Sequence, residues 1–165
     1  QKEGWVEMSM ELSEHAAFTI IETADIGGTS ASTAYVAMTN FARVMAYAEI
    51  GTWDSSDDLD TAKLQQATDS SGTSVKDLTT SASGGDYDTD TDALDADGDF
   101  VIIEARAEEF DVDNGFDYVR LTLAEAGNTG VDNVTAFLIR YGYAYPQKEL
   151  NGAATAGSKV YVRQS

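Results

Sequence analysis

Several segments of this chain alternate apolar and polar residues with a period of two, and this pattern limits the fold more than any other feature. In ARVMAYAEI (42–50) and in DYVRLTL (117–123), every second residue is apolar. Successive side chains of a β-strand point to opposite faces, so this alternation predicts strands with one buried face. Further strands are predicted at the start of 61–78 and at 33–41, 100–107, 134–145 and 159–163. The segment 134–145 is apolar on both faces at its start, which predicts a central strand covered on both sides.

Clusters rich in Gly, Asn and Ser separate these segments, and they have the composition of turns. They are GGTSAS (27–32), SSGT (70–73), SGG (83–85), DNG (113–115), GNTG (127–130) and NG (151–152). Short strands joined by such turns predict an all-β fold, an antiparallel β-sandwich or jelly roll. The predicted core residues are Val44, Ala46, Ile50, Leu64, Val101, Ile103, Val119, Leu121, Leu123, Val134 and Leu138.

We expect one β-sandwich domain at 33–165, with an acidic loop at 84–99 and a C-terminal strand or tail. Residues 1–32 are expected to form an N-terminal arm and hinge. Within the arm, 6–18 has apolar residues at helical spacing, but Met8, Met10 and Leu12 also alternate as in a strand. The chain has 165 residues and 42% hydrophobic residues, enough to fold around one core without disulfides. The absence of Cys excludes thiol chemistry and Cys-bound metals.

The formal net charge of −19 narrows the range of partners. Nucleic acids and anionic membranes are recognised through clustered Lys and Arg, so neither is an expected partner. No apolar run is long enough for a membrane-spanning helix.

The segment 84–99 contains seven Asp residues: Asp86, Asp88, Asp90, Asp92, Asp95, Asp97 and Asp99. Crowded carboxylates attract hard cations such as calcium. The best match to an EF-hand loop starts at Asp88, but it has Ala93 where that loop needs Gly, and it ends in Asp99 instead of Glu. We therefore expect a solvated acidic loop, with no metal and no cofactor.

The chain carries no recognisable catalytic motif, and we expect that it is not an enzyme. His15 is the only histidine, and its surroundings, SEHAAF, contain no G-x-S-x-G nucleophile motif. With 29 acidic side chains, pairs of carboxylates occur by chance and do not indicate a hydrolase.

Two regions are candidates for partner contact. Tyr141, Tyr143 and Tyr145 alternate at the end of a predicted strand, and Tyr is enriched at protein interfaces. The N-terminal arm is rich in apolar residues for a segment outside the main strand pattern, which favours an interface. The predicted partner-contact residues are Trp5, Met8, Leu12, Phe18, Tyr141, Tyr143 and Tyr145.

Two motifs carry a resemblance to a known family. L-Q-x-A-x-D at 64–69 is followed by Gly72, and G-F-x-x-V-R-L occupies 115–121. Together with ARVMAYAEIG before them and NVTAFLIRYGYAYP after them, this order resembles the small cement, or decoration, proteins of tailed-bacteriophage capsids.

The resemblance implies a virion structural protein on the outer surface of the capsid. Such a protein bridges subunits of the major capsid protein, often as a homotrimer, and stabilises the head shell. The alternative is a secreted or surface-appendage β-sandwich that binds calcium through its acidic loop.

Overall fold

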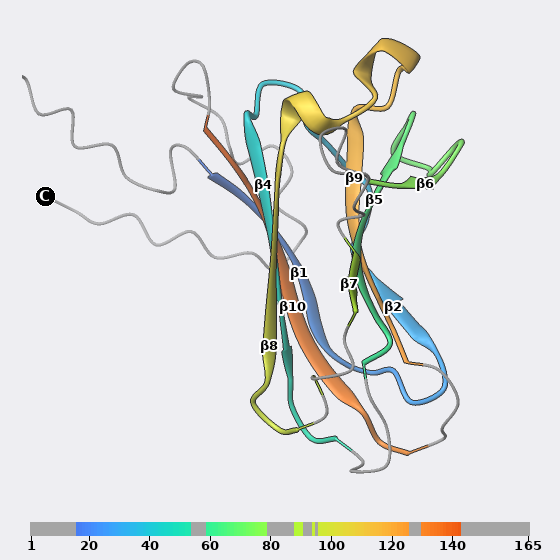
Figure 1. The fold of residues 1–165 in the computed structure, drawn as a ribbon, viewed down its shortest axis with the longest axis vertical. Helices are drawn as coiled ribbons and strands as arrows, with labels where there is room; N and C mark the ends of the chain where they lie inside the picture. Colours follow the sequence, from blue (N-terminus) through green and yellow to red (C-terminus); the bar gives the residue numbers. More distant parts are fainter. Residues whose placement is uncertain are drawn as a thin grey trace, which may run out of the picture.

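The computed structural model describes residues 16–53, 59–78, 88–90, 94, 96–125 and 130–142. In this part of the chain two antiparallel β-sheets pack face to face, one on each side of Figure 1. The regular elements are strands and two short 3₁₀ turns, η1 (Ala107–Glu109) and η2 (Val112–Asn114). The prediction of an all-β, antiparallel β-sandwich is confirmed.

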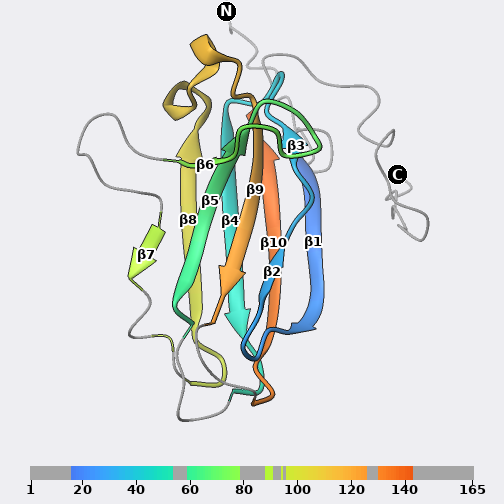
Figure 2. The same ribbon diagram turned by 90° about the vertical axis from the view of Figure 1, so that its right-hand side faces the viewer.

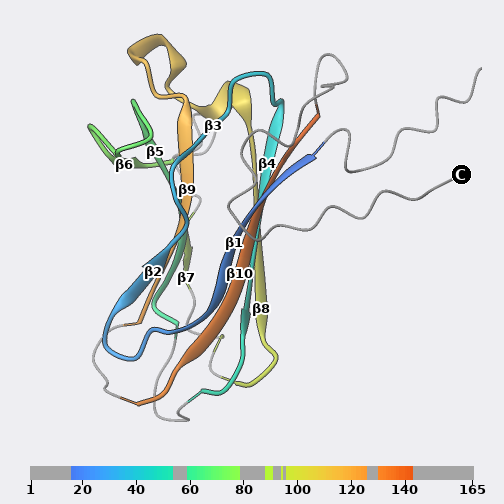
Figure 3. The same ribbon diagram turned by 180° about the vertical axis from the view of Figure 1, so that it is seen from behind.

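The first sheet, sheet A, has four long strands. In spatial order they are β1 (Ala16–Asp25), β10 (Asn133–Tyr141), β4 (Arg43–Ile50) and β8 (Phe100–Arg106). The strand β1 starts where β10 ends, because Ala16 is the register partner of Tyr141. The two strands run side by side in Figure 3.

The second sheet, sheet B, lies in front of sheet A in Figure 2. Its strands in order are β2 (Ser30–Ser32), β9 (Tyr118–Ala124), β5 (Thr61–Ala67) and β6 (Lys76–Asp77), while β3 (Val36–Ala37) pairs with β9 and β7 (Asp88–Asp90) with β5. The long pair β5–β9 forms the centre of this sheet.

The core fills the space between the two sheets. The inward residues of β4, β5, β9 and β10 are almost fully buried, as the period-two pattern predicts. Every predicted core residue is buried except Val101. This residue, near the start of β8, is partly buried and packs against the core.

The expected arm and hinge at 1–32 is wrong for 16–32. Residues of this range form β1, which pairs along β10, and β2, which pairs with β9. The sequence pattern of β1 is short: Phe18 and Ile20 point outward and Ile21 inward, and a register shift between Ile21 and Ala24 then interrupts the alternation. Residues 1–15, called the N-terminal segment below, lie outside the described residues.

Three other features differ from the sequence prediction: the length of one strand, the extent of the acidic loop and the exposure of β10. The strand expected at 33–41 is only β3, and Asn40 has a positive φ of 71° that ends extended structure there. Part of the expected loop at 84–99 is the strand β7. β10 is central in sheet A, but its outer face stays partly exposed instead of being covered. The predicted strand at 159–163 lies outside the described residues.

Candidate partner-binding surfaces

The solvent side of sheet A carries a cluster of apolar side chains, here called the outer apolar face. Two come from each strand: Phe18 and Ile20 from β1, Ile139 and Phe137 from β10, Met45 and Tyr47 from β4, and Ile102 and Phe100 from β8. Their backbones are register neighbours, so the side chains form contiguous rows across the sheet.

One row crosses all four strands. Ile20 is paired with Phe137, Phe137 with Tyr47, and Tyr47 with Ile102. The Tyr47 ring stacks on Phe137 with 4.9 Å between ring centroids and on Phe100 with 5.7 Å. Stacking of this kind fixes the aromatic side chains against each other.

The outer apolar face is open to solvent. Phe18 is 52% exposed, Ile20 66%, Phe100 56% and Ile102 53%. Scattered exposed apolar residues are ordinary, but a contiguous apolar surface rimmed by polar groups marks an interaction site.

Charged groups lie at both ends of this face. At one end Arg43 pairs with Glu104 at 3.5 Å, Arg106 lies beside them, and the Tyr141 hydroxyl donates a hydrogen bond to Glu104. At the other end the Tyr47 hydroxyl donates to Glu49 at 2.8 Å, and this hydrogen bond raises the pKa of Tyr47. The described side chains here include two arginines and two glutamates, and Arg106 also pairs with Glu108 at 3.3 Å, so this face carries little net charge on a chain of net charge −19.

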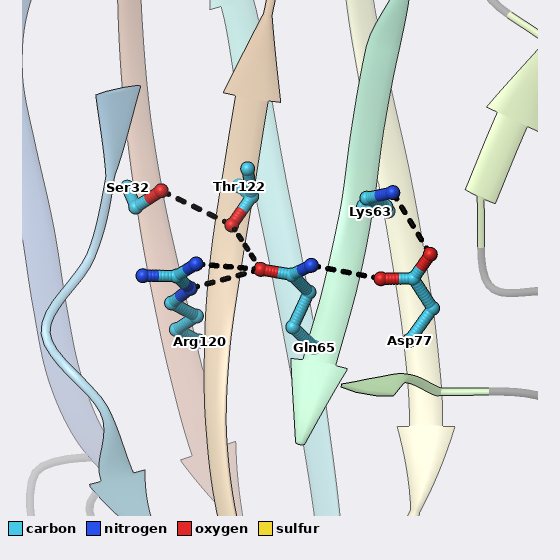
Figure 4. Close-up of polar contacts among 6 residues, drawn as sticks. All are labelled: Ser32, Lys63, Gln65, Asp77, Arg120 and Thr122. Atoms are coloured by element: carbon cyan, nitrogen blue, oxygen red, sulfur yellow. Dashed lines mark hydrogen bonds and ion pairs between the residues drawn. The ribbon is translucent and has the colours of Figure 1, made fainter. Parts of the chain in front are cut away.

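The solvent side of sheet B is different, because a polar network crosses it (Figure 4). The Gln65 Oε1 atom accepts hydrogen bonds from Arg120 Nε at 3.0 Å, Arg120 Nη2 at 2.7 Å and Thr122 Oγ1 at 3.0 Å. The Gln65 Nε2 atom donates to Asp77 Oδ1 at 2.8 Å. Both ends of this amide are thus satisfied, and the amide ties three strands together.

An ion pair closes one side of the network. Lys63 Nζ lies 2.8 Å from Asp77 Oδ2. Partial burial of Asp77 tends to raise its pKa, but the hydrogen bonds from Lys63 and Gln65 outweigh burial and lower it. On the other side, the Arg120 guanidinium lies over the Tyr35 ring at 4.6 Å from the centroid.

The turn after β5 is built by Asp69. Its Oδ1 atom accepts hydrogen bonds from the backbone N–H groups of Ser71 at 2.8 Å and Thr73 at 3.0 Å, and Oδ2 accepts from Thr73 Oγ1 at 2.6 Å. The side-chain hydrogen bond from Thr73 is the main cause of a lowered pKa at Asp69. Gly72 has a φ of +79°, and a Cβ there would lie 2.7 Å from the Tyr35 ring.

The two motifs singled out in the sequence meet in this sheet. The ladder between β5 and β9 pairs Leu64 with Leu121 and Gln65 with Arg120. The first pair is fully buried, and the second forms the centre of the polar network. The motif residues therefore hold the sheet in register and turn the chain.

Of the predicted contact residues, Phe18 and Tyr141 lie in the described part. Both are on the outer side of sheet A, where Phe18 belongs to the outer apolar face and Tyr141 to its charged rim. Trp5, Met8, Leu12, Tyr143 and Tyr145 lie outside the described residues. Sequence reasoning missed Ile20, Phe100 and Ile102, although apolar residues at consecutive positions in FTII and FVII signalled strands apolar on both faces.

Other candidate chemistry is sparse in the described part of the chain. Two carboxylates of the acidic segment bind backbone, with Trp53 N donating to Asp97 Oδ1 at 2.9 Å and Ala96 N to Asp99 Oδ2 at 3.3 Å. Within the described ranges, no group of three or more His, Asp or Glu residues could hold a metal ion.

One depression in the described part has a volume of about 540 Å³ and is open to solvent. It is lined by Gln66, Lys76, Asp77, Glu108, Glu109, Phe110 and Asp111. Two of these residues, Lys76 and Asp111, form an ion pair with each other. None of the helical turns described is long or apolar enough to cross a membrane.

Comparison of the chain with models of protein families, with curated proteins and with solved structures found no match.

Proposed function

We propose that this protein is a structural protein of a bacteriophage virion that decorates the outer surface of the capsid. It has no catalytic role in this proposal. It stabilises the head shell by bridging subunits of the major capsid protein, as a homotrimer. The family comes from the resemblance carried by the motifs at 64–69 and 115–121.

The outer apolar face is the observation that supports a binding role best. It offers an apolar surface with little net charge among its described side chains, on a chain that is strongly acidic as a whole, and a sheet of four long strands supports it rigidly. Rigid side chains lose little entropy on binding, which favours firm association with a large partner. The acidic remainder of the surface keeps unattached copies soluble.

The motif residues fit the same role. A catalytic site brings reactive groups together around a substrate, whereas Gln65, Arg120 and Asp69 satisfy each other or the backbone. They lock the scaffold, as expected of a protein whose task is to hold its shape on a particle.

The second candidate function is a calcium-binding β-sandwich of a secreted protein or surface appendage. It is favoured by the seven Asp residues within 84–99. This candidate requires carboxylates to converge on a cation, whereas Asp97 and Asp99 accept hydrogen bonds from backbone N–H groups.

Quantitative mass spectrometry of purified phage particles tests the proposal directly. We expect the chain at a fixed ratio to the major capsid protein. A decoration assay then adds purified protein to particles that lack it and counts bound copies. Binding that saturates at a fixed number per particle and raises the temperature of shell disruption is the expected result. No saturable binding, or a chain absent from purified particles, contradicts the proposal.

The same assay tests whether the N-terminal segment contributes to attachment. Because β1 starts at Ala16, deletion of residues 1–15 leaves the described sandwich intact, whereas deletion through Phe18 would remove part of β1. We expect the shortened chain to decorate particles at least about tenfold more weakly, one order of magnitude in affinity being about 1.4 kcal/mol. Equal occupancy and affinity would show that the segment is not the anchor.

A further inference from the structure

The described elements leave the outer apolar face uncovered. Sheet B packs on the other side of sheet A, and in Figures 1 and 3 no labelled strand lies over the outer side. Four side chains of this face are more than half exposed. A surface of this kind has an occupant in the working assembly.

The N-terminal segment has the sequence pattern of such an occupant. Its even-numbered positions carry Val6, Met8, Met10 and Leu12, while the odd-numbered ones between them are Glu7, Ser9 and Glu11. This is the alternation of a strand with one apolar face.

We propose that residues 6–12 of one copy of this chain lie on the outer apolar face of a neighbouring copy. This inference rests on the proposed function and deepens it, because it names the residues through which copies of the proposed homotrimer contact one another.

The length of residues 6–12 agrees with the width of the outer apolar face. Seven extended residues span roughly 23 Å at about 3.3 Å per residue. The four strands of sheet A are about 4.8 Å apart, so the face is roughly 14 Å from the first to the last strand. The apolar half of the segment is therefore long enough to cross the face along its diagonal.

The charges also agree. After the four apolar residues, the next even-numbered position is Glu14. The apolar rows of sheet A are likewise followed by a row that contains Arg43 and Arg106. Each of these arginines also pairs with a glutamate, Arg43 with Glu104 and Arg106 with Glu108. Both pairs are exposed, and Glu14 can lie beside them when the apolar parts are in contact. A face with few charged side chains also repels a second copy of charge −19 less than the acidic remainder of the surface does.

The residues just before β1 favour contact of the segment with a neighbouring copy over contact with its own sheet. To fold back over its own sheet, the chain would have to reverse between Leu12 and Ala16, and SEH (13–15) contains no Gly, Pro, Asn or Asp. Those four residue types are the strongest turn formers, and Ser13 is the one residue of 13–15 that belongs to a weaker turn-forming type. A segment that continues in the direction of β1 leaves the end of the sheet and reaches another molecule.

The contact joins two different surfaces, the segment of one copy and the face of the next. Such heterologous contacts close into rings when the rotation between copies permits. In a closed trimer each face receives one segment, so every face and every segment has a contact.

Cross-linking tests the contact. The chain contains no Cys, so only the introduced cysteines can react. The full-length variants Met8→Cys and Ile102→Cys are mixed in equal amounts and treated with a short bis-maleimide. We expect a product of two-chain mass that needs both cysteines. The control replaces Ile102→Cys by Val131→Cys, a residue of similar exposure (57% against 53%) in the loop before β10. Its cross-linked yield should be at least tenfold lower.

The variant that carries both Met8→Cys and Ile102→Cys separates the two arrangements. We expect two-chain and larger products from it as well. Cross-linking only within single chains would place the segment on its own sheet and overturn the proposal. Equal yields with Val131→Cys would overturn it too, because the contact would then be unspecific.

Sedimentation equilibrium gives an independent measure. Deletion of residues 1–15, or Ile102→Ser on the face, should weaken self-association at least tenfold, whereas Val112→Ser, also about half exposed, should not. Mixing the deletion variant with Ile102→Ser should restore pairs, because one supplies an intact face and the other an intact segment. An intact chain that is monomeric, or that associates as strongly as the deletion variant, refutes the inference. These measurements contain no particles, so their failure would remove the contact between copies, whereas failure of the decoration assay would remove the capsid assignment.

Discussion

Replacing Leu121 by Ala removes three carbon atoms from the centre of the core. Leu121 is fully buried on β9 and faces its register partner Leu64 across the central ladder of sheet B. The lost transfer free energy is about 0.8 kcal/mol for each buried carbon group, or about 2.4 kcal/mol in total. A residual cavity of roughly 100 Å³ adds about 2.4 kcal/mol more if nothing relaxes.

The expected loss of unfolding free energy is therefore about 2.4 to 5 kcal/mol. Urea unfolding followed by tryptophan fluorescence should show a lower midpoint with an unchanged m-value. In a thermal scan the loss corresponds to a decrease in Tm of roughly 5 to 20 °C for a domain of this size. Val131→Ala is the matched control, because Val131 is 57% exposed and its truncation should cost less than about 0.5 kcal/mol. A Leu121→Ala protein as stable as this control would refute the assignment of strand faces.

Three further predictions concern the turn, the polar network and the acidic segment. Gly72→Ala should lower the free energy of unfolding by about 1 to 3 kcal/mol. The loss should exceed that of Gly115→Ala, because both glycines have positive φ but only a Cβ at position 72 would lie against Tyr35. Equal urea midpoints for the two variants would contradict this. The lowered pKa of Asp77 means that its stabilising effect is present above pH about 4 and is lost as pH falls through the folded-state pKa. The difference in unfolding free energy between the wild type and Asp77→Asn should therefore shrink between pH 6 and pH 2.5, and a constant difference would rule out this linkage. Calorimetry should show no calcium binding tighter than about 10 μM to the segment 86–99, and tighter binding would support the calcium-binding alternative.

The fold was predictable where one strand face is apolar and the other polar. On β4 and β9 the alternation itself tells which residues point inward, so the core was correctly predicted. It was not predictable for β1, because the register shift between Ile21 and Ala24 interrupts the alternation of this strand after a few residues. The two-residue strands β3 and β6 exist only through their pairing partners, which a local pattern does not contain.

The candidate surfaces were predictable only in part. The sequence identified Phe18 and Tyr141, but the face that contains them depends on the register of four strands that are distant along the chain. The same limit applies to Gln65 and Arg120, which are 55 positions apart and meet only through the β5–β9 ladder. Register is a tertiary property, set by all the pairs of a sheet together.

The register of β1 with β10 also determines how the molecule responds to mechanical force. Ala16 and Tyr141 lie opposite each other at the same end of two antiparallel neighbours. Tension applied through residues before Ala16 and after Tyr141 pulls these strands apart sideways, along the direction of their hydrogen bonds. The bonds then bear the load one after another, beginning with the first pair, instead of sharing it as they would in shear. A sandwich tethered by both ends is therefore expected to open like a zipper at low force, while β5 and β9, which belong to the other sheet, stay folded longer.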